Sequence, residues 1–187
     1  MRYTALVVAL ATLACGGSSS SGSTGTPQAM NALAQEVSTA ANAYDALAAG
    51  MSGAADCSSD ENQYDAQVRP QITQMLDMGP QMDTMMMGSL GDPADADMTC
   101  AADAMMAELD HHRSLACSSA TDMGPNVDEA HRHATAMMQW ADHEMARTSA
   151  MGSMMGGGMG GMPGGGMSTG HCVKSGDGSY SMHQRED

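Results

Sequence analysis

The chain has 187 residues, contains 23 methionines and no phenylalanine, and carries a formal net charge of −15 at pH 7. A charge of this sign excludes nucleic acid as an expected partner, because phosphate binding requires clusters of lysine and arginine. The acidity is compatible with attraction of cations, and equally with a simple role in keeping a methionine-rich protein soluble.

The first residues are MRYTALVVALATLAC, in which one arginine precedes an apolar run too short to cross a membrane. This pattern is typical of a secretory signal. Residues 11–15 resemble the end of a bacterial lipoprotein signal. The resemblance implies that residues 1–14 are a signal peptide, that Cys15 becomes lipidated, and that the protein faces the periplasm or the cell surface. Gly16, in place of aspartate, favours the outer membrane. Residues 15–28 would then be the lipidated cysteine and a flexible Gly/Ser linker.

Residues 29–150 contain four segments in which apolar residues recur every three or four positions, the period of an amphipathic helix. Proline at positions 70 and 80 is expected to kink or divide the second segment. The sequence therefore predicts an all-α, up-down-up-down four-helix bundle with a disordered N-terminal linker and a Gly/Met-rich C-terminal tail over residues 151–187. The four predicted stripes run from Met30 to Met51, Tyr64 to Met86, Met98 to Ala116, and Val127 to Met145.

Four cysteines remain besides Cys15, and an even number in an oxidising compartment indicates two disulfides. In this topology the ends of the first and third helices lie at one pole, which favours the pair Cys57–Cys117. The start of the third helix and the chain after the fourth share the other pole. The second predicted disulfide is therefore Cys100–Cys172, which would close a loop around the Met-rich tail.

All seven histidines lie in the C-terminal half of the chain. When the third and fourth segments are paired as an antiparallel hairpin, His112 faces His131, and two methionine layers, Met105 with Met138 and Met98 with Met145, follow on the same seam. Imidazole binds copper, zinc and nickel, so His112 and His131 are a candidate divalent metal site. The alternative is that these histidines are partly exposed and paired with carboxylates, and that the methionines only fill the core.

The stretch MMGGGMGGMPGGGM, with its neighbours, places methionines in a glycine-rich chain that cannot maintain a packed core. Thioether sulfur selects Cu(I) or Ag(I), and glycine allows several thioethers to approach one ion. The candidate ligands are Met151, Met154, Met155, Met159, Met162, Met167 and His171. Cys172 would join them as a thiolate if it were reduced. A neutral low-complexity segment, or a sacrificial oxidant sink, would use the same residues without metal.

No nucleophile with an adjacent base is apparent, so the protein is not expected to be an enzyme. Glu108-x-x-His111 and Asp128-x-x-His131 have the spacing of di-iron bundle ligands, but Glu108 and His111 fall beside the predicted core seam. The sequence thus favours a noncatalytic envelope lipoprotein that binds copper or silver, with Cu(I) as the expected ion. The alternative is a structural lipoprotein that binds another envelope protein and has no metal role.

Overall fold

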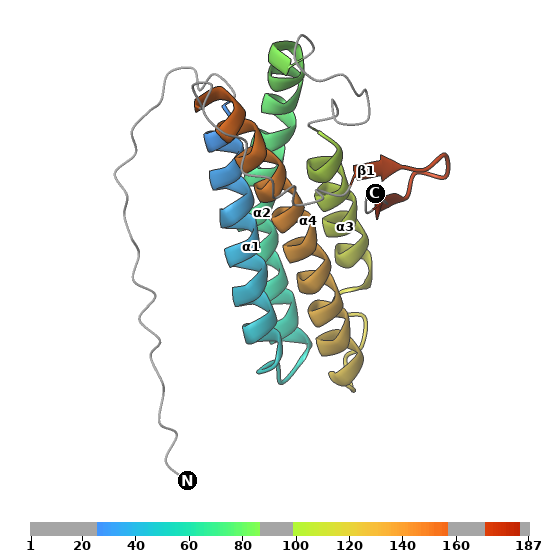
Figure 1. Cartoon of the computed structure of the whole chain (residues 1–187). Coiled ribbons are helices and arrows are strands. Elements are labelled where there is room, and N and C mark those ends of the chain that lie inside the picture. Colours follow the sequence, from blue (N-terminus) through green and yellow to red (C-terminus); the bar gives the residue numbers. More distant parts are fainter. Residues whose placement is uncertain (1–25, 87–98, 157–170, 184–187) are drawn as a thin grey trace.

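The computed structural model describes residues 26–86, 99–156 and 171–183. Four helices, α1 (Pro27–Ala48), α2 (Ala54–Met86), α3 (Cys100–Leu115) and α4 (Gly124–Gly156), form a bundle in which successive helices run in opposite directions (Figure 1). Helices α1 and α3 each pack against both α2 and α4. The predicted up-down-up-down four-helix bundle is therefore confirmed. Among the described residues, no helix is long and apolar enough to cross a membrane.

Helix α1 shows most directly how the sequence specifies a helix. The Thr26 side chain accepts a hydrogen bond of 3.1 Å from the amide of Ala29, and Pro27 occupies the first turn. An N-cap hydroxyl and an early proline both favour helix initiation. The predicted stripe is buried along its entire length, from Met30 to Met51.

Helix α2 continues through both prolines, which were expected to kink or divide it. Pro70 and Pro80 are exposed, so the carbonyl groups that lose their amide partners lie on the side of the helix nearest solvent. The opposite side of α2 is buried and carries Tyr64, Val68 and Ile72. Packing of this apolar side compensates for the missing backbone hydrogen bonds.

The core is built mainly from alanine and methionine, with two tyrosines and few branched side chains. Small alanines allow the helices to approach closely, and the flexible methionines fill the remaining space. Methionine dominates the half of the bundle where α1 begins and α2 and α4 end. The buried methionines of this half are Met30, Met75, Met78, Met82, Met105 and Met151.

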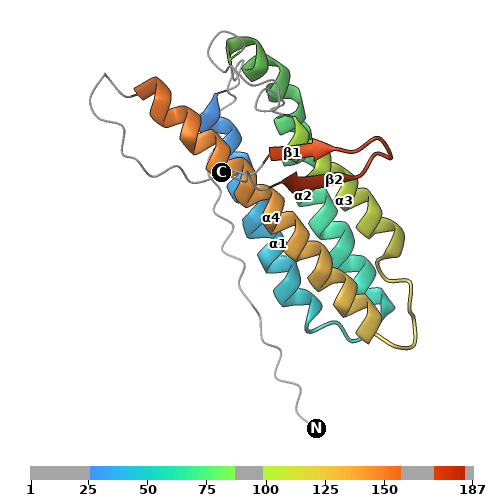
Figure 2. The same ribbon diagram turned by 45° about the vertical axis from the view of Figure 1, so that its right-hand side comes forward.

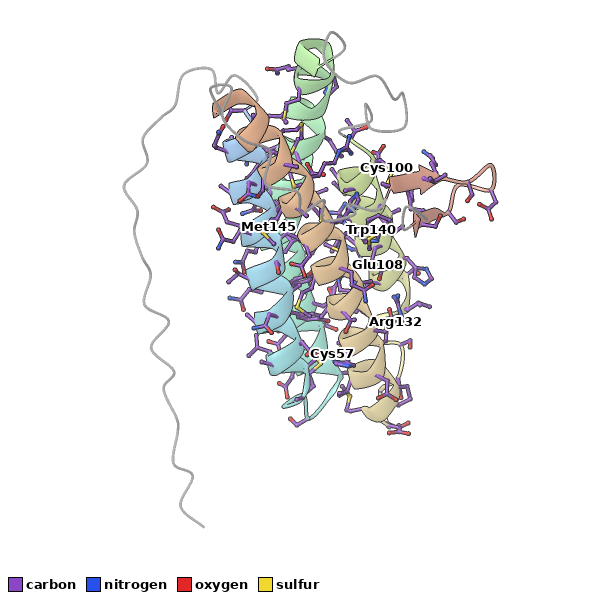
Figure 3. All side chains as sticks on the ribbon, in the orientation of Figure 1. Cys57, Cys100, Glu108, Arg132, Trp140 and Met145 are labelled. Carbon is purple, nitrogen blue, oxygen red and sulfur yellow. A yellow bond between two sulfur atoms is a disulfide. The ribbon has the colours of Figure 1, made fainter. Side chains whose placement is uncertain are left out.

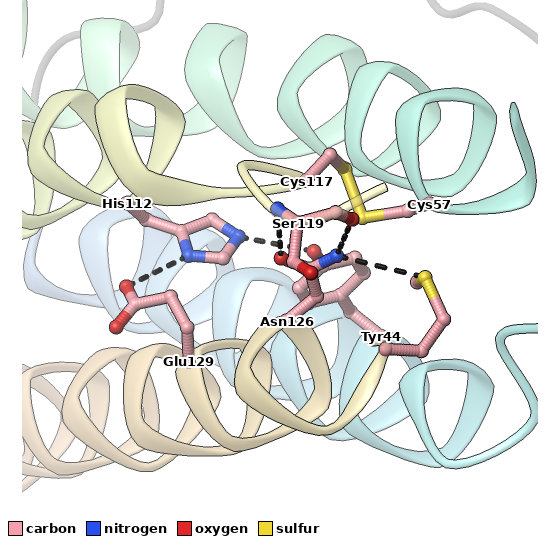
Figure 4. The surroundings of a disulfide bond; sticks show 8 residues. Tyr44, Cys57, His112, Cys117, Ser119, Asn126 and Glu129 are labelled. Atoms are coloured by element: carbon pink, nitrogen blue, oxygen red, sulfur yellow. Dashed lines mark hydrogen bonds and ion pairs between the residues drawn. A yellow bond between two sulfur atoms is a disulfide. The ribbon is translucent and has the colours of Figure 1, made fainter. Parts of the chain in front are cut away.

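Both predicted disulfides are present. Cys57 at the start of α2 is bonded to Cys117 after α3, with Cα atoms 5.7 Å apart, and Cys100 is bonded to Cys172 with Cα atoms 5.9 Å apart. Cys117 has a positive φ of 58°. Beside the first bond, the Asn126 side chain closes the α3–α4 connection by donating to the Ser119 carbonyl at 2.7 Å and accepting from its amide at 3.2 Å (Figure 4).

The C-terminal region contains more structure than predicted. Helix α4 extends past the predicted bundle boundary at residue 150 to Gly156, and a small antiparallel hairpin follows, made of β1 (His171–Lys174) and β2 (Tyr180–His183). The hairpin lies beside α3, to which Cys172 joins it (Figure 2). Residues 1–25 and 157–170, which contain Cys15 and most of the glycine-rich stretch, lie outside the described residues.

Candidate functional site

His112 and His131 do not face each other as the sequence predicted. His112 is fully buried, whereas the His131 side chain is 69% exposed and its Nδ1 lies 2.9 Å from Asp45 Oδ1 on α1. The buried face of α4 is centred on Ala130, His133 and Met137, so the predicted stripe is rotated about the helix axis. The predicted pairing of His112 with His131 is therefore wrong, because the structure does not bring these two side chains together.

The predicted methionine layers are displaced for the same reason. Met105 is fully buried, but on α4 the fully buried methionine is Met137, while Met138 and Met145 are only partly buried. Met98 lies outside the described residues. Met105 and Met137 are packed in the core, and Met138 and Met145 pack against it.

His112 instead stacks on His133, with ring centroids 4.0 Å apart and an interplanar angle of 14°. Two tyrosines from the other half of the bundle form a second stack beside them: the Tyr44 and Tyr64 centroids are 4.4 Å apart. We call Tyr44, Tyr64, His112 and His133 the Tyr–His cluster. Its members come from α1, α2, α3 and α4, so all four helices must assemble to form it.

Each histidine of the Tyr–His cluster is held through both ring nitrogens. His112 Nδ1 lies 3.1 Å from Glu129 Oε1, and its Nε2 lies 3.0 Å from the Tyr44 hydroxyl (Figure 4). His133 repeats this arrangement, with Nδ1 2.9 Å from Glu108 Oε1 and Nε2 3.2 Å from the Tyr64 hydroxyl. A carboxylate only accepts, so when such a ring is neutral its Nδ1 carries the proton and its Nε2 accepts from the phenol.

Arg132 joins the two halves of the arrangement. Its guanidinium binds Glu108 Oε1 at 2.8 Å and Glu129 Oε1 at 2.7 Å. Figure 3 shows Glu108 on α3 and Arg132 on α4 close together on one side of the bundle. The two carboxylates therefore have fixed positions, and through them the two imidazole rings have fixed orientations.

Burial and hydrogen bonding determine the protonation of this region. Desolvation and the neighbouring His133 lower the pKa of His112 to about 4, so this ring is neutral near pH 7. The hydrogen bond from Arg132 is the main cause that lowers the pKa of Glu129 to about 2. Burial acts to raise the pKa of Glu108, but hydrogen bonds from His133 and Arg132 outweigh it and lower the pKa.

The tyrosines remain protonated, because burial raises the pKa of both Tyr44 and Tyr64 well above the usual phenol value. The carboxyl of Glu61 is a further cause of the increase at both residues. Glu61 is 6% exposed, and its Oε1 has no hydrogen-bond partner. Burial is the main cause that raises the pKa of Glu61, and the charge of Asp65 is the second.

A surface pocket of about 180 Å³ reaches Glu61 from outside, next to the Cys57–Cys117 disulfide. Glu61 thus lines this pocket and also acts through its charge on Tyr44 and Tyr64. The pocket is lined by Ser58, Glu61, Asn62, Arg113, Ala116 and Cys117.

Within residues 26–86, 99–156 and 171–183, no three His, Cys, Asp or Glu side chains converge to hold a metal ion. The di-iron spacing of Glu108 with His111 is not used, since Glu108 bonds to His133 and His111 is exposed.

The predicted thioether ligands fall into three groups. Met151 is 5% exposed and packs in the core, so it is not a residue of a flexible tail. Met154 and Met155 belong to the last turns of α4. Met159, Met162 and Met167 lie outside the described residues. His171 begins β1, and Cys172 is bonded to Cys100, which excludes a thiolate ligand while that bond is intact.

Replacement of Met151 by alanine should lower the free energy of unfolding by about 2 kcal/mol, the low end for loss of a buried methionine. Urea unfolding monitored by helical circular dichroism measures this effect. Gln139→Ala is the matched control, because Gln139 is exposed on the same helix and its loss should change stability little. Equal stability of the two variants would mean that Met151 does not contribute to the core.

The chain matches no known protein-family model, and searches among functionally described proteins and solved structures find no significant relative. The arguments about function therefore depend on the residues of this chain alone.

Proposed function

We propose that the protein is a noncatalytic binder of Cu(I) or Ag(I) in the cell envelope, anchored to a membrane through lipidated Cys15. Its ligands are the thioethers of Met154, Met155, Met159, Met162 and Met167. Soft cations prefer thioether sulfur, and this stretch offers several such groups with glycines between them. Met151 is left out of the ligand set because it is needed in the core.

The observation that carries this proposal is that both ends of the methionine-rich stretch are attached to the bundle. Helix α4 holds one end up to Gly156, and the disulfide from Cys172 to Cys100 holds the other. A segment with both ends attached has fewer conformations to lose than a free tail when several of its side chains gather around one ion. The disulfide thereby lowers the entropic cost of metal capture.

The test is a Cu(I) titration, under conditions that leave the disulfides intact, against a competing Cu(I) chelator. The titration uses a protein of residues 16–187. The variant carries leucine at the five ligand positions. Leucine keeps the apolar volume and removes sulfur. We expect the native chain to withdraw Cu(I) at a defined stoichiometry, and the variant to bind about tenfold or more weakly.

This design is preferable to truncation after Ala150, which would also remove core residue Met151 and leave Cys100 without its partner. Met123→Leu/Met138→Leu is the control for loss of thioethers elsewhere and should bind as the native chain does. If the native chain and the five-leucine variant compete equally, the proposal fails. The alternative, a lipoprotein that binds another envelope protein, would then be preferred.

A further inference from the structure

We propose that the Tyr–His cluster is a second metal site, specific for Cu(II), with His112 Nε2, His133 Nε2 and the phenol oxygens of Tyr44 and Tyr64 as ligands. This site extends the proposed metal function to the bundle core. It uses none of the thioethers and none of residues 157–170, so the two sites can be tested separately.

The first argument is the orientation of the imidazoles. Metal-binding histidines usually donate their second ring N–H to a carboxylate, which fixes the ring and makes it more basic. Glu129 and Glu108 accept from Nδ1 of His112 and His133 at 3.1 and 2.9 Å, and Arg132 holds both carboxylates. Both rings therefore direct Nε2 towards a tyrosine hydroxyl, where a metal ion would replace the phenol proton. A purely apolar core would require neither the two imidazoles, nor the two carboxylates, nor the guanidinium.

The second argument is the spacing of the four donor atoms. Two ligands that lie about 2.0–2.1 Å from one ion, at angles between square and tetrahedral, are about 2.8–3.4 Å apart. The Tyr44–His112 and Tyr64–His133 contacts, 3.0 and 3.2 Å, fall in this range. The ring stacks of 4.0 and 4.4 Å place the two Tyr–His pairs side by side. Rotation of the two imidazole rings, together with inward shifts of the four side chains, would direct the four donor atoms to one ion between the pairs.

The third argument is the identity of the donors. Two imidazole nitrogens and two phenolate oxygens, arranged as two adjacent pairs, suit a tetragonal ion such as Cu(II). Without thioether or thiolate donors, the set has no preference for Cu(I). The binding step balances as exchange of one Cu²⁺ for two phenol protons, which pass to solvent, and no atom is oxidised or reduced.

The fourth argument is charge. The buried Glu61 carboxyl is the principal charge acting on Tyr44, it also acts on Tyr64, and its Oε1 has no hydrogen-bond partner. A divalent ion beside the tyrosines would compensate this carboxylate. Glu61 also lines the pocket next to Cys117, together with Arg113.

The experiment adds Cu(II) to protein from Gly16 to Asp187 without reductant, and measures visible absorption and electron paramagnetic resonance. We expect one equivalent of Cu(II) to give a phenolate-to-Cu(II) charge-transfer band and nitrogen hyperfine splitting from two imidazoles. Tyr44→Phe/Tyr64→Phe should lose the band and bind Cu(II) about tenfold or more weakly. The five-leucine variant should retain both signals, which separates this site from the thioether site.

The matched controls are Tyr180→Phe, on the hairpin, and His131→Gln, at the exposed histidine beside the cluster. Both should leave the spectra unchanged. If the tyrosine variant fails to fold, the charge-transfer band and the hyperfine splitting of the native chain still test the proposal. Absence of the charge-transfer band in native protein, or loss of the Cu(II) signal in His131→Gln, would overturn it and indicate binding at surface histidines.

Discussion

Protein in which Cys57 and Cys117 are both replaced by alanine should unfold with a free energy about 3–4 kcal/mol below that of the native chain. The bond joins residues 60 positions apart, and a loop of this size restricts the unfolded chain by an amount equivalent to about 4 kcal/mol in the chain-entropy model. Small domains are stable by about 5–15 kcal/mol, so this loss removes a large part of the total. Urea unfolding of metal-free protein measures it.

Alanine is preferred to serine for this experiment because Cys57 is 1% exposed, and a hydroxyl buried there would add its own cost. The matched control is Cys100→Ala/Cys172→Ala, which opens a comparable loop of 72 residues but detaches only a peripheral hairpin from α3. We expect a smaller loss in the control. If the Cys57 and Cys117 variant loses less than about 1 kcal/mol, the chain-entropy argument does not apply to this bundle.

Acidification of metal-free protein from pH 7 to pH 4 should lower the free energy of unfolding by about 3 kcal/mol through His112 alone. The folded protein keeps this ring neutral down to a pKa of about 4, whereas the usual value is 6.5. Between these two values the unfolded chain binds a proton that the folded chain does not. Stability therefore falls as the pH falls through this range, and the loss is complete below pH 4.

Other groups modify this profile with known sign. Glu129, whose pKa is lowered to about 2, stabilises the fold above pH 4.5 and loses that contribution as the pH falls towards 2. Glu61 and Asp60 act in the opposite direction, because burial raises their pKa values and protonation relieves the cost. When stability is measured by urea unfolding at several pH values, it should fall less steeply with falling pH in His112→Gln than in the native chain. A native slope in His112→Gln would contradict the assignment.

The helix faces of the first half of the chain were predictable because their apolar residues repeat without interruption. The stripe from Met30 to Met51 is buried as predicted, and so are Tyr64, Val68 and Ile72 on α2. Both disulfides followed from bundle topology, since an antiparallel arrangement of four helices determines which connections share a pole. The pairing of cysteines far apart in the sequence could thus be predicted without any knowledge of side-chain packing.

The buried face of α4 was harder to predict because polar residues determine it. In the sequence AHRHA, residues 130–134, His131 and His133 are equally plausible core positions from local periodicity. His133 is buried because Tyr64 and Glu108, on two other helices, supply partners for both ring nitrogens. His131 finds Asp45 at the surface instead. Such partners lie far apart in sequence, so periodicity alone cannot select the residue.

The hairpin, in contrast, has a local signal that the prediction did not use. Asp177 and Gly178 form the dipeptide most typical of a tight β-turn, and Gly178 has a φ of 87°. The Asp177 side chain also accepts from the amide and hydroxyl of Ser179, at 3.0 and 2.7 Å. The methionine-rich composition of the preceding residues obscured this turn, because the whole region after residue 150 was interpreted as one low-complexity tail.

The order of the disulfides along the chain determines what a single backbone cleavage can release. The two covalent loops overlap, since Cys100 lies between Cys57 and Cys117 while its partner Cys172 lies beyond both. A single backbone cleavage anywhere between Cys57 and Cys172 therefore leaves the two fragments linked by at least one sulfur bridge. A cut between residues 157 and 170 would not release the hairpin, because the bond between Cys100 and Cys172 would still join it to the fragment that holds all four helices.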